Sequence, residues 1–141
     1  MKNGLILLIE DDVDDQEIII DTLQTLGVQN EIKTFDNGQK ALDFLKIMEK
    51  QPFIIISDVN LPVMNGLQLK TEIQNNDFLR SKSIPFIFLT TSGDKKAVEE
   101  AYQLQAQGFF VKEITYEGIN KQLRGIIDYW KNCKHPNYHE Q

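Results

Sequence analysis

The chain has 141 residues, of which 41% are hydrophobic and 26% charged, and its formal net charge is −6. This length and composition fit one domain with a single core. Because no block of Lys or Arg offsets the acidic charge, the sequence argues against a nucleic-acid partner, which needs a basic face. The longest apolar run, Leu5–Ile9, is far shorter than the roughly 20 residues that cross a bilayer, and the sole cysteine, Cys133, cannot form an internal disulfide. We therefore expect a cytoplasmic protein that binds neither a membrane nor nucleic acid.

Short apolar runs alternate with segments of helical period along residues 1–131. Four runs are nearly continuous, as in strands that helices cover on both faces of a parallel sheet, and a fifth mixes polar and apolar residues, as an edge strand does. Five helices are marked by apolar residues at steps of three and four. We expect strands at residues 5–9, 31–35 (the edge strand), 53–56, 86–89 and 109–111. The first helix should span 14–26, opened by a capping box at Asp14-x-x-Glu17 and stopped by Gly27. The next three helices should run through Ala41, Leu45 and Met48, through Leu69 and Ile73, and through Ala97, Ala101 and Leu104, and the last, capped by Thr115, through Tyr116, Ile119, Leu123, Ile126 and Trp130.

Strand–helix units repeated five times predict a doubly wound α/β fold in a single domain over residues 1–131. Residues 132–141 follow the last predicted helix, and we expect them to form a flexible tail. The tail holds Cys133, His135 and His139, which are too few ligands for a closed zinc site. Because the two histidines are the only ones in the chain, a site built on buried histidines is not expected.

Polar side chains follow four of the predicted strands. Glu10 and Asp11 come after the first strand, Asp58 after the third, Thr90 after the fourth and Lys112 after the fifth. In open α/β sheets, ligands bind beyond the carboxyl ends of the strands. The sequence therefore gathers several carboxylates, a hydroxyl and a lysine at one edge of the sheet.

This combination of side chains suits phosphoryl transfer. Crowded carboxylates repel one another, and a hard cation such as Mg²⁺ relieves the repulsion. Asp58 could then attack phosphorus as a carboxylate nucleophile. The metal, Lys112 and the Thr90 hydroxyl would neutralise the charge on the transferring group.

Each feature also has an ordinary structural explanation. The acidic residues suit the positive end of a helix, the segment after Asp58 suits a turn, the hydroxyls after the fourth strand suit a helix cap, and Lys112 suits a solvated surface. Independent structural causes would not place all four at strand ends of one parallel sheet. We therefore favour a functional site.

The same residues lie in segments that resemble the receiver domains of two-component response regulators, and the resemblance spans residues 3 to 131. Its marks are Leu7–Asp12, Ile56–Pro62 with Gly66, Pro85–Thr90 and Gly108–Lys112. The resemblance implies a five-stranded, flavodoxin-like parallel sheet of order 2-1-3-4-5 with five helices. It also implies roles for individual residues: Asp58 as phosphoacceptor, and Asp11, Glu10 (through water), Asp58 and the backbone carbonyl of Asn60 as ligands of Mg²⁺ or Mn²⁺.

The family pattern further implies that Thr90 and Lys112 contact the phosphoryl group, and two positions depart from that pattern. Phe109 stands where the family commonly has a switching aromatic, often Tyr, so we expect Thr90 and Phe109 to form a switch that lacks a phenolic hydroxyl. Glu113 replaces a proline that usually follows the lysine in a cis bond. A cis bond without proline costs about 3–4 kcal/mol, which leaves the isomer open and favours trans. The pair Tyr129-Trp130 is similar to that of stand-alone receivers that serve bacterial phytochrome kinases.

The resemblance implies a stand-alone receiver in a two-component phosphorelay. A sensor histidine kinase or phosphotransfer protein would phosphorylate Asp58, and the face formed by the fourth helix, fifth strand and last helix would bind a target or a second copy of the chain. We expect no output domain, because the chain ends about ten residues after the last helix. The protein would be an acceptor rather than an enzyme, with self-phosphotransfer and slow autodephosphorylation at most.

Three alternatives use overlapping residues. A phosphatase of the haloacid dehalogenase type also combines Asp, Thr, Lys and Mg²⁺, but it needs a second Asp where this chain has Asn60, and its nucleophile normally follows the first strand. A flavodoxin-like cofactor binder needs a first loop rich in Ser, Thr and Gly, whereas the acidic segment 10–15 would repel phosphate. The third is a receiver fold that only docks partners, although every phosphorylation residue is present.

Overall fold

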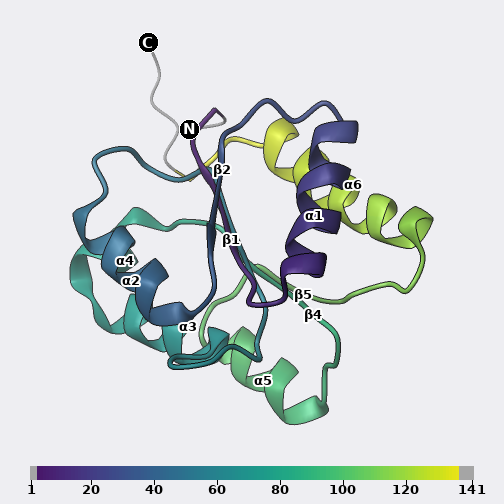
Figure 1. Ribbon diagram of the computed structural model, residues 1–141. Helices are drawn as coiled ribbons and strands as arrows, with labels where there is room; N and C mark the ends of the chain where they lie inside the picture. The colour runs from purple at the N-terminus through teal and green to yellow at the C-terminus, as the bar shows by residue number, and fades with distance from the viewer. Residues whose placement is uncertain (1–2, 137–141) are drawn as a thin grey trace.

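The computed structural model describes residues 3–136, which form a three-layer α/β sandwich (Figure 1). A five-stranded parallel sheet lies in the middle, in the order β2-β1-β3-β4-β5, which confirms the expected order. The register places Ile9 of β1 opposite Phe35 of β2 on one side and Ser57 of β3 on the other. The strands are β1 (Ile6–Ile9), β2 (Ile32–Phe35), β3 (Ile54–Ser57), β4 (Phe86–Thr90) and β5 (Gly108–Val111).

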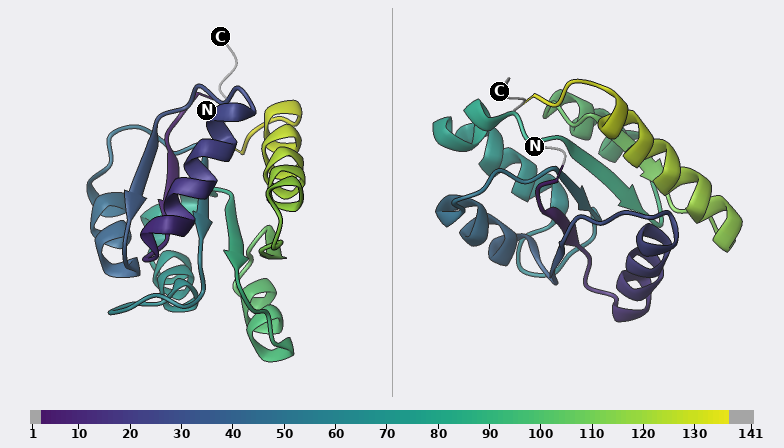
Figure 2. Two further views of the ribbon diagram at one scale, coloured as in Figure 1. Left: turned by 45° about the vertical axis from the view of Figure 1, so that its right-hand side comes forward. Right: turned by 90° about the horizontal axis from the view of Figure 1, so that it is seen from above.

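Helices cover both faces of the sheet (Figure 2). Apolar residues of α1 and α6 pack on one face, and those of α2, α3, α4 and α5 pack on the other. The helices are α1 (Val13–Thr25), α2 (Gly38–Ile47), α3 (Gly66–Asn75), α4 (Asp77–Lys82), α5 (Lys95–Gln103) and α6 (Tyr116–Asn132). None of the helices in the described part of the chain has the length and apolarity that a membrane crossing requires.

The inner strands bury side chains on both faces, which explains their continuous apolar runs. Every residue of β1 and β3 is buried, with Leu7 and Ile55 facing one core and Leu8 and Ile56 facing the other. Full burial of one such side chain stabilises the fold by about 1.5–3 kcal/mol. The first edge strand, β2, is only half-buried, as its mixed composition predicts.

The helices differ from the sequence prediction at three places. Helix α1 begins at Val13 and its N-cap is Asp12, whose side chain accepts a hydrogen bond from the Asp15 N–H at 3.0 Å, so the capping box expected at Asp14 is wrong. Helix α2 ends at Ile47, before Met48. A sixth helix, α4, was not expected because six residues with one buried side chain, Leu79, show no periodicity.

The chain after α6 is packed against the body of the protein as far as the structure describes it. His135 is only 3% exposed, and its Nε2 lies 2.7 Å from the Phe53 carbonyl oxygen, just before β3. Its ring stacks on Phe53 with centroids 5.6 Å apart. The expected flexible tail therefore does not begin at 132, and His139 lies outside the described residues.

Candidate functional site

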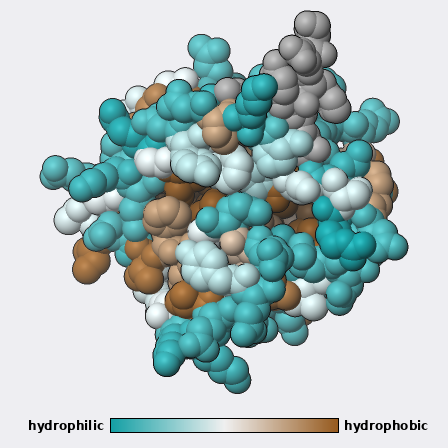
Figure 3. Space-filling model, turned by 180° about the vertical axis from the view of Figure 1, so that it is seen from behind, coloured by the Kyte–Doolittle hydropathy of each residue, from teal (hydrophilic) through white to brown (hydrophobic). Residues whose placement is uncertain are grey.

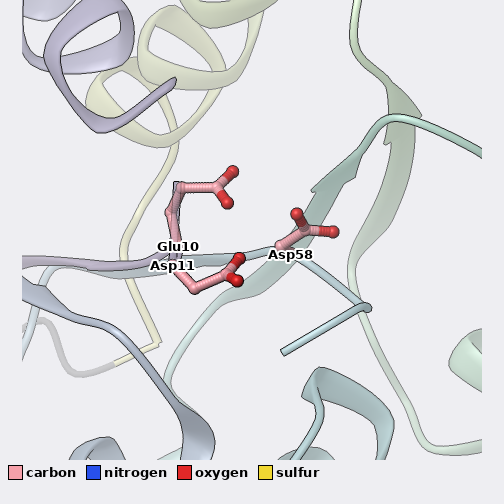
Figure 4. A group of neighbouring side chains, drawn as sticks. All are labelled: Glu10, Asp11 and Asp58. Carbon is pink, nitrogen blue, oxygen red and sulfur yellow. The ribbon is translucent and has the colours of Figure 1, made fainter. Parts of the chain in front are cut away.

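The carboxyl edge of the sheet brings the predicted side chains together. Glu10 and Asp11 follow β1, Asp58 follows β3, Thr90 ends β4 and Lys112 follows β5. Figure 4 shows the carboxylates of Glu10, Asp11 and Asp58 gathered at the ends of their strands. The hydrophobic strands fix the Cα positions of these residues, so their polar side chains reach the same small volume at the strand ends.

Three carboxylates form a cluster that fits a divalent cation. One oxygen from each of Glu10, Asp11 and Asp58 lies within 4.8 Å of the others. Glu10 and Asp58 are buried, whereas Asp11 is exposed. An all-oxygen donor set of this charge is what hard cations such as Mg²⁺ and Mn²⁺ take in proteins. The role of the Asn60 backbone carbonyl as a ligand stays a prediction.

Asp58 is held by donors from two neighbouring segments. The buried Thr90 hydroxyl donates to Asp58 Oδ1 at 2.6 Å, and the Asn60 N–H donates to the same oxygen at 3.2 Å. The other oxygen, Oδ2, lies 3.7 Å from the Lys112 ammonium. One oxygen of Asp58 is thus fixed by neutral donors, and the other faces a cation.

Gly66 allows the loop after Asp58 to fold back onto the site. The Gly66 N–H donates to the Val59 carbonyl at 2.9 Å, and a Cβ at position 66 would lie 2.2 Å from the Asp58 carbonyl oxygen. No other residue could occupy this position without moving the backbone at Asp58. The glycine in the predicted motif therefore has a steric cause.

Lys112 lies among three carboxylates. Its ammonium forms ion pairs with Glu10, with Asp15 at 3.1 Å and with Asp58 at 3.7 Å, while its side chain is only 10% exposed. The contact between Lys112 and Asp15 was not predicted, because Asp15 stood only as one of the acidic residues in segment 10–15. The position of Asp15 in the first turn of α1, shortly after Glu10 and Asp11, was the feature of the sequence that could have predicted this contact.

Burial and neighbouring opposite charge shift the pKa values of Glu10 and Lys112 in opposite directions. Burial raises the pKa of Glu10 from its usual 4.5 to about 7; Lys112 acts against this, and the charge of Asp58 adds to it. Burial lowers the pKa of Lys112, but the hydrogen bond and charge of Glu10, together with Asp58 and Asp15, outweigh burial and raise it. The lysine therefore stays protonated and offsets the carboxylates in the absence of metal.

The loop that carries Lys112 is held by a residue that the sequence analysis also missed. Its peptide bonds are trans, since no cis bond occurs in residues 3–136. Gln122 on α6 donates from Nε2 to the Val111 carbonyl at 2.6 Å and accepts from the Glu113 N–H at 3.1 Å. One side chain therefore fixes the backbone on both sides of Lys112, and no cis proline is needed. Gln122 lies in α6, outside the Gly108–Lys112 motif, so nothing in the motif pointed to it.

Phe109 packs between the sheet and the loop after β4. It is half-buried, and its ring centroid lies 5.8 Å from that of Phe88. A Cβ on Gly93 would lie 2.7 Å from a ring carbon of Phe109, so this loop covers the ring closely. Phe109 therefore lies beside the loop that follows Thr90, and its role as a switch stays a prediction.

Comparison with known proteins supports the assignment of this edge. The family model described as response regulator receiver domain matches residues 6–124. Response regulator Rcp1 of Synechocystis sp. is 30% identical over 131 residues, covering 89% of this chain and 88% of that protein.

Two solved structures have the same fold. The phosphorylated cyanobacterial phytochrome response regulator RcpA superimposes with a TM-score of 0.83 at 25% identity, covering 92% of this chain and 95% of that one. The Mn²⁺-bound form of Rcp1 gives 0.83 at 28% identity, covering 94% and 99%. The narrower likeness to phytochrome-associated regulators is thereby confirmed as a similarity. From its carboxylate edge, its strand order and these relatives, the chain belongs to the response regulator receiver domain family.

Proposed function

We propose that Asp58 accepts a phosphoryl group from a phosphohistidine of a partner kinase or phosphotransfer protein, in a reaction that depends on Mg²⁺. The observation that carries this proposal is the asymmetric setting of the Asp58 carboxylate. Oδ1 is bound by Thr90 at 2.6 Å, while Oδ2 faces the Lys112 ammonium at 3.7 Å beside two further carboxylates. Such a group is oriented for attack and surrounded by charge that matches a phosphoryl group.

The chemical step needs little from the protein beyond position and charge. A carboxylate oxygen of Asp58 attacks phosphorus, the bond from phosphorus to the donor's imidazole nitrogen breaks, and its electron pair returns to the imidazole. Lys112 neutralises the developing charge on the phosphoryl oxygens. Glu10, Asp11 and Asp58 would hold the cation, which when bound supplies further neutralisation of both carboxylates and phosphoryl oxygens.

Within residues 3–136 the one histidine is His135, and it lies against Phe53 at the edge of the sheet opposite Asp58. We infer that the phosphoryl donor is another molecule. Within the described residues, no second acid stands two positions beyond Asp58 to drive rapid turnover, because that position is Asn60. We therefore propose a phosphoacceptor that resides in the cytoplasm, reacts with small donors by itself and loses its phosphoryl group slowly, rather than an enzyme.

The signal would leave through the groove between β5 and α6. A cavity of about 780 Å³ there is lined by Phe109, Phe110, Tyr129 and Trp130, and Tyr129 is 64% exposed. In the view of Figure 3, apolar residues show between hydrophilic ones across this side of the molecule. We infer that movement of Thr90 toward the phosphoryl group draws Phe109 inward and reshapes this groove for a partner protein.

Intact-mass spectrometry tests the phosphorylation itself. With acetyl phosphate and Mg²⁺, the chain should gain one phosphoryl group, and it should gain none in EDTA. Asp58→Asn should stay unmodified, whereas the exposed control Asp128→Asn should react like the parent. Modification of Asp58→Asn to the parent's extent would contradict the assignment.

A separate experiment tests the output. Phe109→Ala should be phosphorylated nearly as fully as the parent but should lose the change in association that beryllofluoride causes. Sedimentation of the chain with and without a candidate partner measures this change. Sedimentation of the chain alone also detects self-association. An unchanged response in Phe109→Ala would mean that the signal does not pass through this ring.

A further inference from the structure

A second polar cavity lies at the amino edge of the sheet, opposite the phosphorylation site. Its volume is about 240 Å³, and α3, α4 and the loop between α5 and β5 form its walls. The strands β4 and β5 begin beside it, at Phe86 and Gly108. Its polar lining residues are Lys70, Gln74, Arg80, Ser83, Gln105 and Gln107.

Lys70 is buried in this wall without an anionic partner. The residue is 4% exposed, its Nζ donates to Gln74 Oε1 at 3.1 Å, and Nζ lies 5.6 Å from the centroid of the Phe86 ring. Within residues 3–136, no carboxylate lines the cavity or pairs with Lys70. One amide oxygen is a poor match for an ammonium group with three donors, so the site has unused capacity for an acceptor.

The two glutamines present further donors. An ammonium and a backbone N–H can only donate, so each must meet the oxygen of an amide. Gln74 accepts from Lys70, and Gln107 Oε1 accepts from the Phe86 N–H at 2.7 Å. The NH₂ group of each glutamine is therefore the part that remains for a ligand. The cavity wall is rich in donors and poor in acceptors, in a chain whose net charge is −6.

Two lining residues occupy backbone conformations that favour glycine. Ser83 has φ 49° and Gln105 has φ 69°, each just after a helix. Glycine is the usual residue at such positions because a side chain there costs free energy. The sequence nevertheless has a polar side chain at both positions on the cavity wall.

We propose that this cavity binds a small oxyanion, a phosphate or a carboxylate, with Lys70 as its central charge and Gln74 as its principal neutral donor. The guanidinium of Arg80 adds positive charge at the rim, although Asp77 pairs with it at 2.8 Å. An oxyanion would complete the coordination of the ammonium and offset its burial, because charge-assisted hydrogen bonds are the strongest ones available. The low pKa of Lys70, which burial lowers to about 8, agrees with a cation that lacks its counter-ion.

Titration with sodium phosphate and sodium acetate, at ionic strength held constant with sodium chloride, tests the proposal. EDTA is present throughout, so that phosphate does not bind through a cation at Asp58. In amide NMR spectra of the parent chain, signals of residues 70–86 and 105–108 should shift in a saturable way. Thermal unfolding should move to higher temperature by more than in chloride. A response to phosphate, to acetate or to both supports the site and identifies which oxyanion it prefers.

Two variants separate the cavity from general surface binding. Lys70→Met removes the charge, and Gln74→Glu supplies an internal carboxylate of the same shape, so each should weaken the response about tenfold or more. The exposed control Lys96→Met and the phosphoacceptor variant Asp58→Asn should respond like the parent. A parent chain with no saturable response, or an equal response in Lys70→Met and Gln74→Glu, would overturn the proposal.

Discussion

The two edges of the sheet each bury a lysine, and the surroundings give the two side chains opposite properties. At the carboxyl edge Lys112 lies among Glu10, Asp15 and Asp58, and its pKa is raised although burial acts to lower it. At the amino edge Lys70 contacts a neutral amide, and burial lowers its pKa to about 8. The burial cost of an ammonium is therefore decided by its partners rather than by depth. The first lysine is part of a charge-balanced site, and the second lacks its balancing charge.

Replacing Lys112 should have the largest effect on stability. Lys112→Gln leaves Glu10 buried beside Asp58 without a cation, and removing one partner of a buried pair costs about 3 kcal/mol of the free energy of unfolding. The loss should depend on pH. Because burial already raises the Glu10 pKa to about 7 from 4.5, Glu10 opposes folding increasingly as pH rises from 4.5 to 7, and below 4.5 it costs nothing.

Urea unfolding in EDTA between pH 5 and 8 measures this effect. The stability of Lys112→Gln should fall more steeply with pH than that of the parent. Adding Glu10→Gln to the variant should flatten the profile. A flat profile in Lys112→Gln itself would mean that Glu10 does not bear the unpaired charge.

Replacing Lys70 should have the opposite sign. Lys70→Met keeps the length of the side chain and removes a buried charge, so the free energy of unfolding at pH 7 should rise by about 2 kcal/mol. The folded-state pKa of about 8 lies below the usual 10.5. The parent should therefore gain stability as pH rises from 8 to 10.5, where the unfolded chain still binds the proton, and the advantage of Lys70→Met should shrink over that range. Chemical unfolding at pH 7 and pH 10 compares the two, and a destabilised Lys70→Met at pH 7 would contradict this account.

A third variant, Asp11→Asn, tests the repulsion among the clustered carboxylates at the carboxyl edge. Asp11→Asn removes one of the three clustered carboxylates, and because Asp11 is exposed the relief of repulsion should be about 1 kcal/mol without metal. The same change should abolish the stabilisation that Mg²⁺ gives the parent. Thermal unfolding with EDTA and with Mg²⁺ supplies both numbers, and Asp128→Asn serves as the control for a surface carboxylate. If Mg²⁺ still stabilises Asp11→Asn as it does the parent, the metal site lies elsewhere.

The sequence predicts the carboxyl edge well because parallel strands bring their ends together. Once the apolar runs define where β1, β3, β4 and β5 end, Glu10, Asp58, Thr90 and Lys112 must meet, whatever the loops do. The edge strand β2 was predicted from its mixed polar and apolar composition, which agrees with its half-buried and exposed residues.

What the sequence does not reveal depends on contacts between segments that are not strand neighbours. Lys70 stands between Leu69 and Thr71 on α3, and its burial beside α4 and the α5–β5 loop shows in no local pattern. His135 meets Phe53 across 82 positions, and its burial shows in no local pattern. The choice of Asp12 over Asp14 as the cap of α1 depends on a backbone angle, because both residues have the same side chain.

The smallest expected effect concerns how the loop of Lys112 is held. Its charge partners fix the ammonium, and Gln122 fixes the backbone through Val111 and Glu113. Gln122→Leu keeps most of the side-chain volume but loses both hydrogen bonds. Because the freed backbone groups can reach water, the free energy of unfolding should fall by only about 0.5–1 kcal/mol. A looser Lys112 would place its charge less well against the phosphoryl group, so the rate of phosphorylation by acetyl phosphate should fall several-fold while the affinity for Mg²⁺ stays unchanged.

Gln122→Glu, which can still accept from Glu113 but cannot donate to Val111, should have a rate between those of the parent and Gln122→Leu. Stopped-flow fluorescence or timed mass spectrometry gives the rate. A rate equal to the parent's in Gln122→Leu would show that the carboxylates around Lys112 are enough to position it.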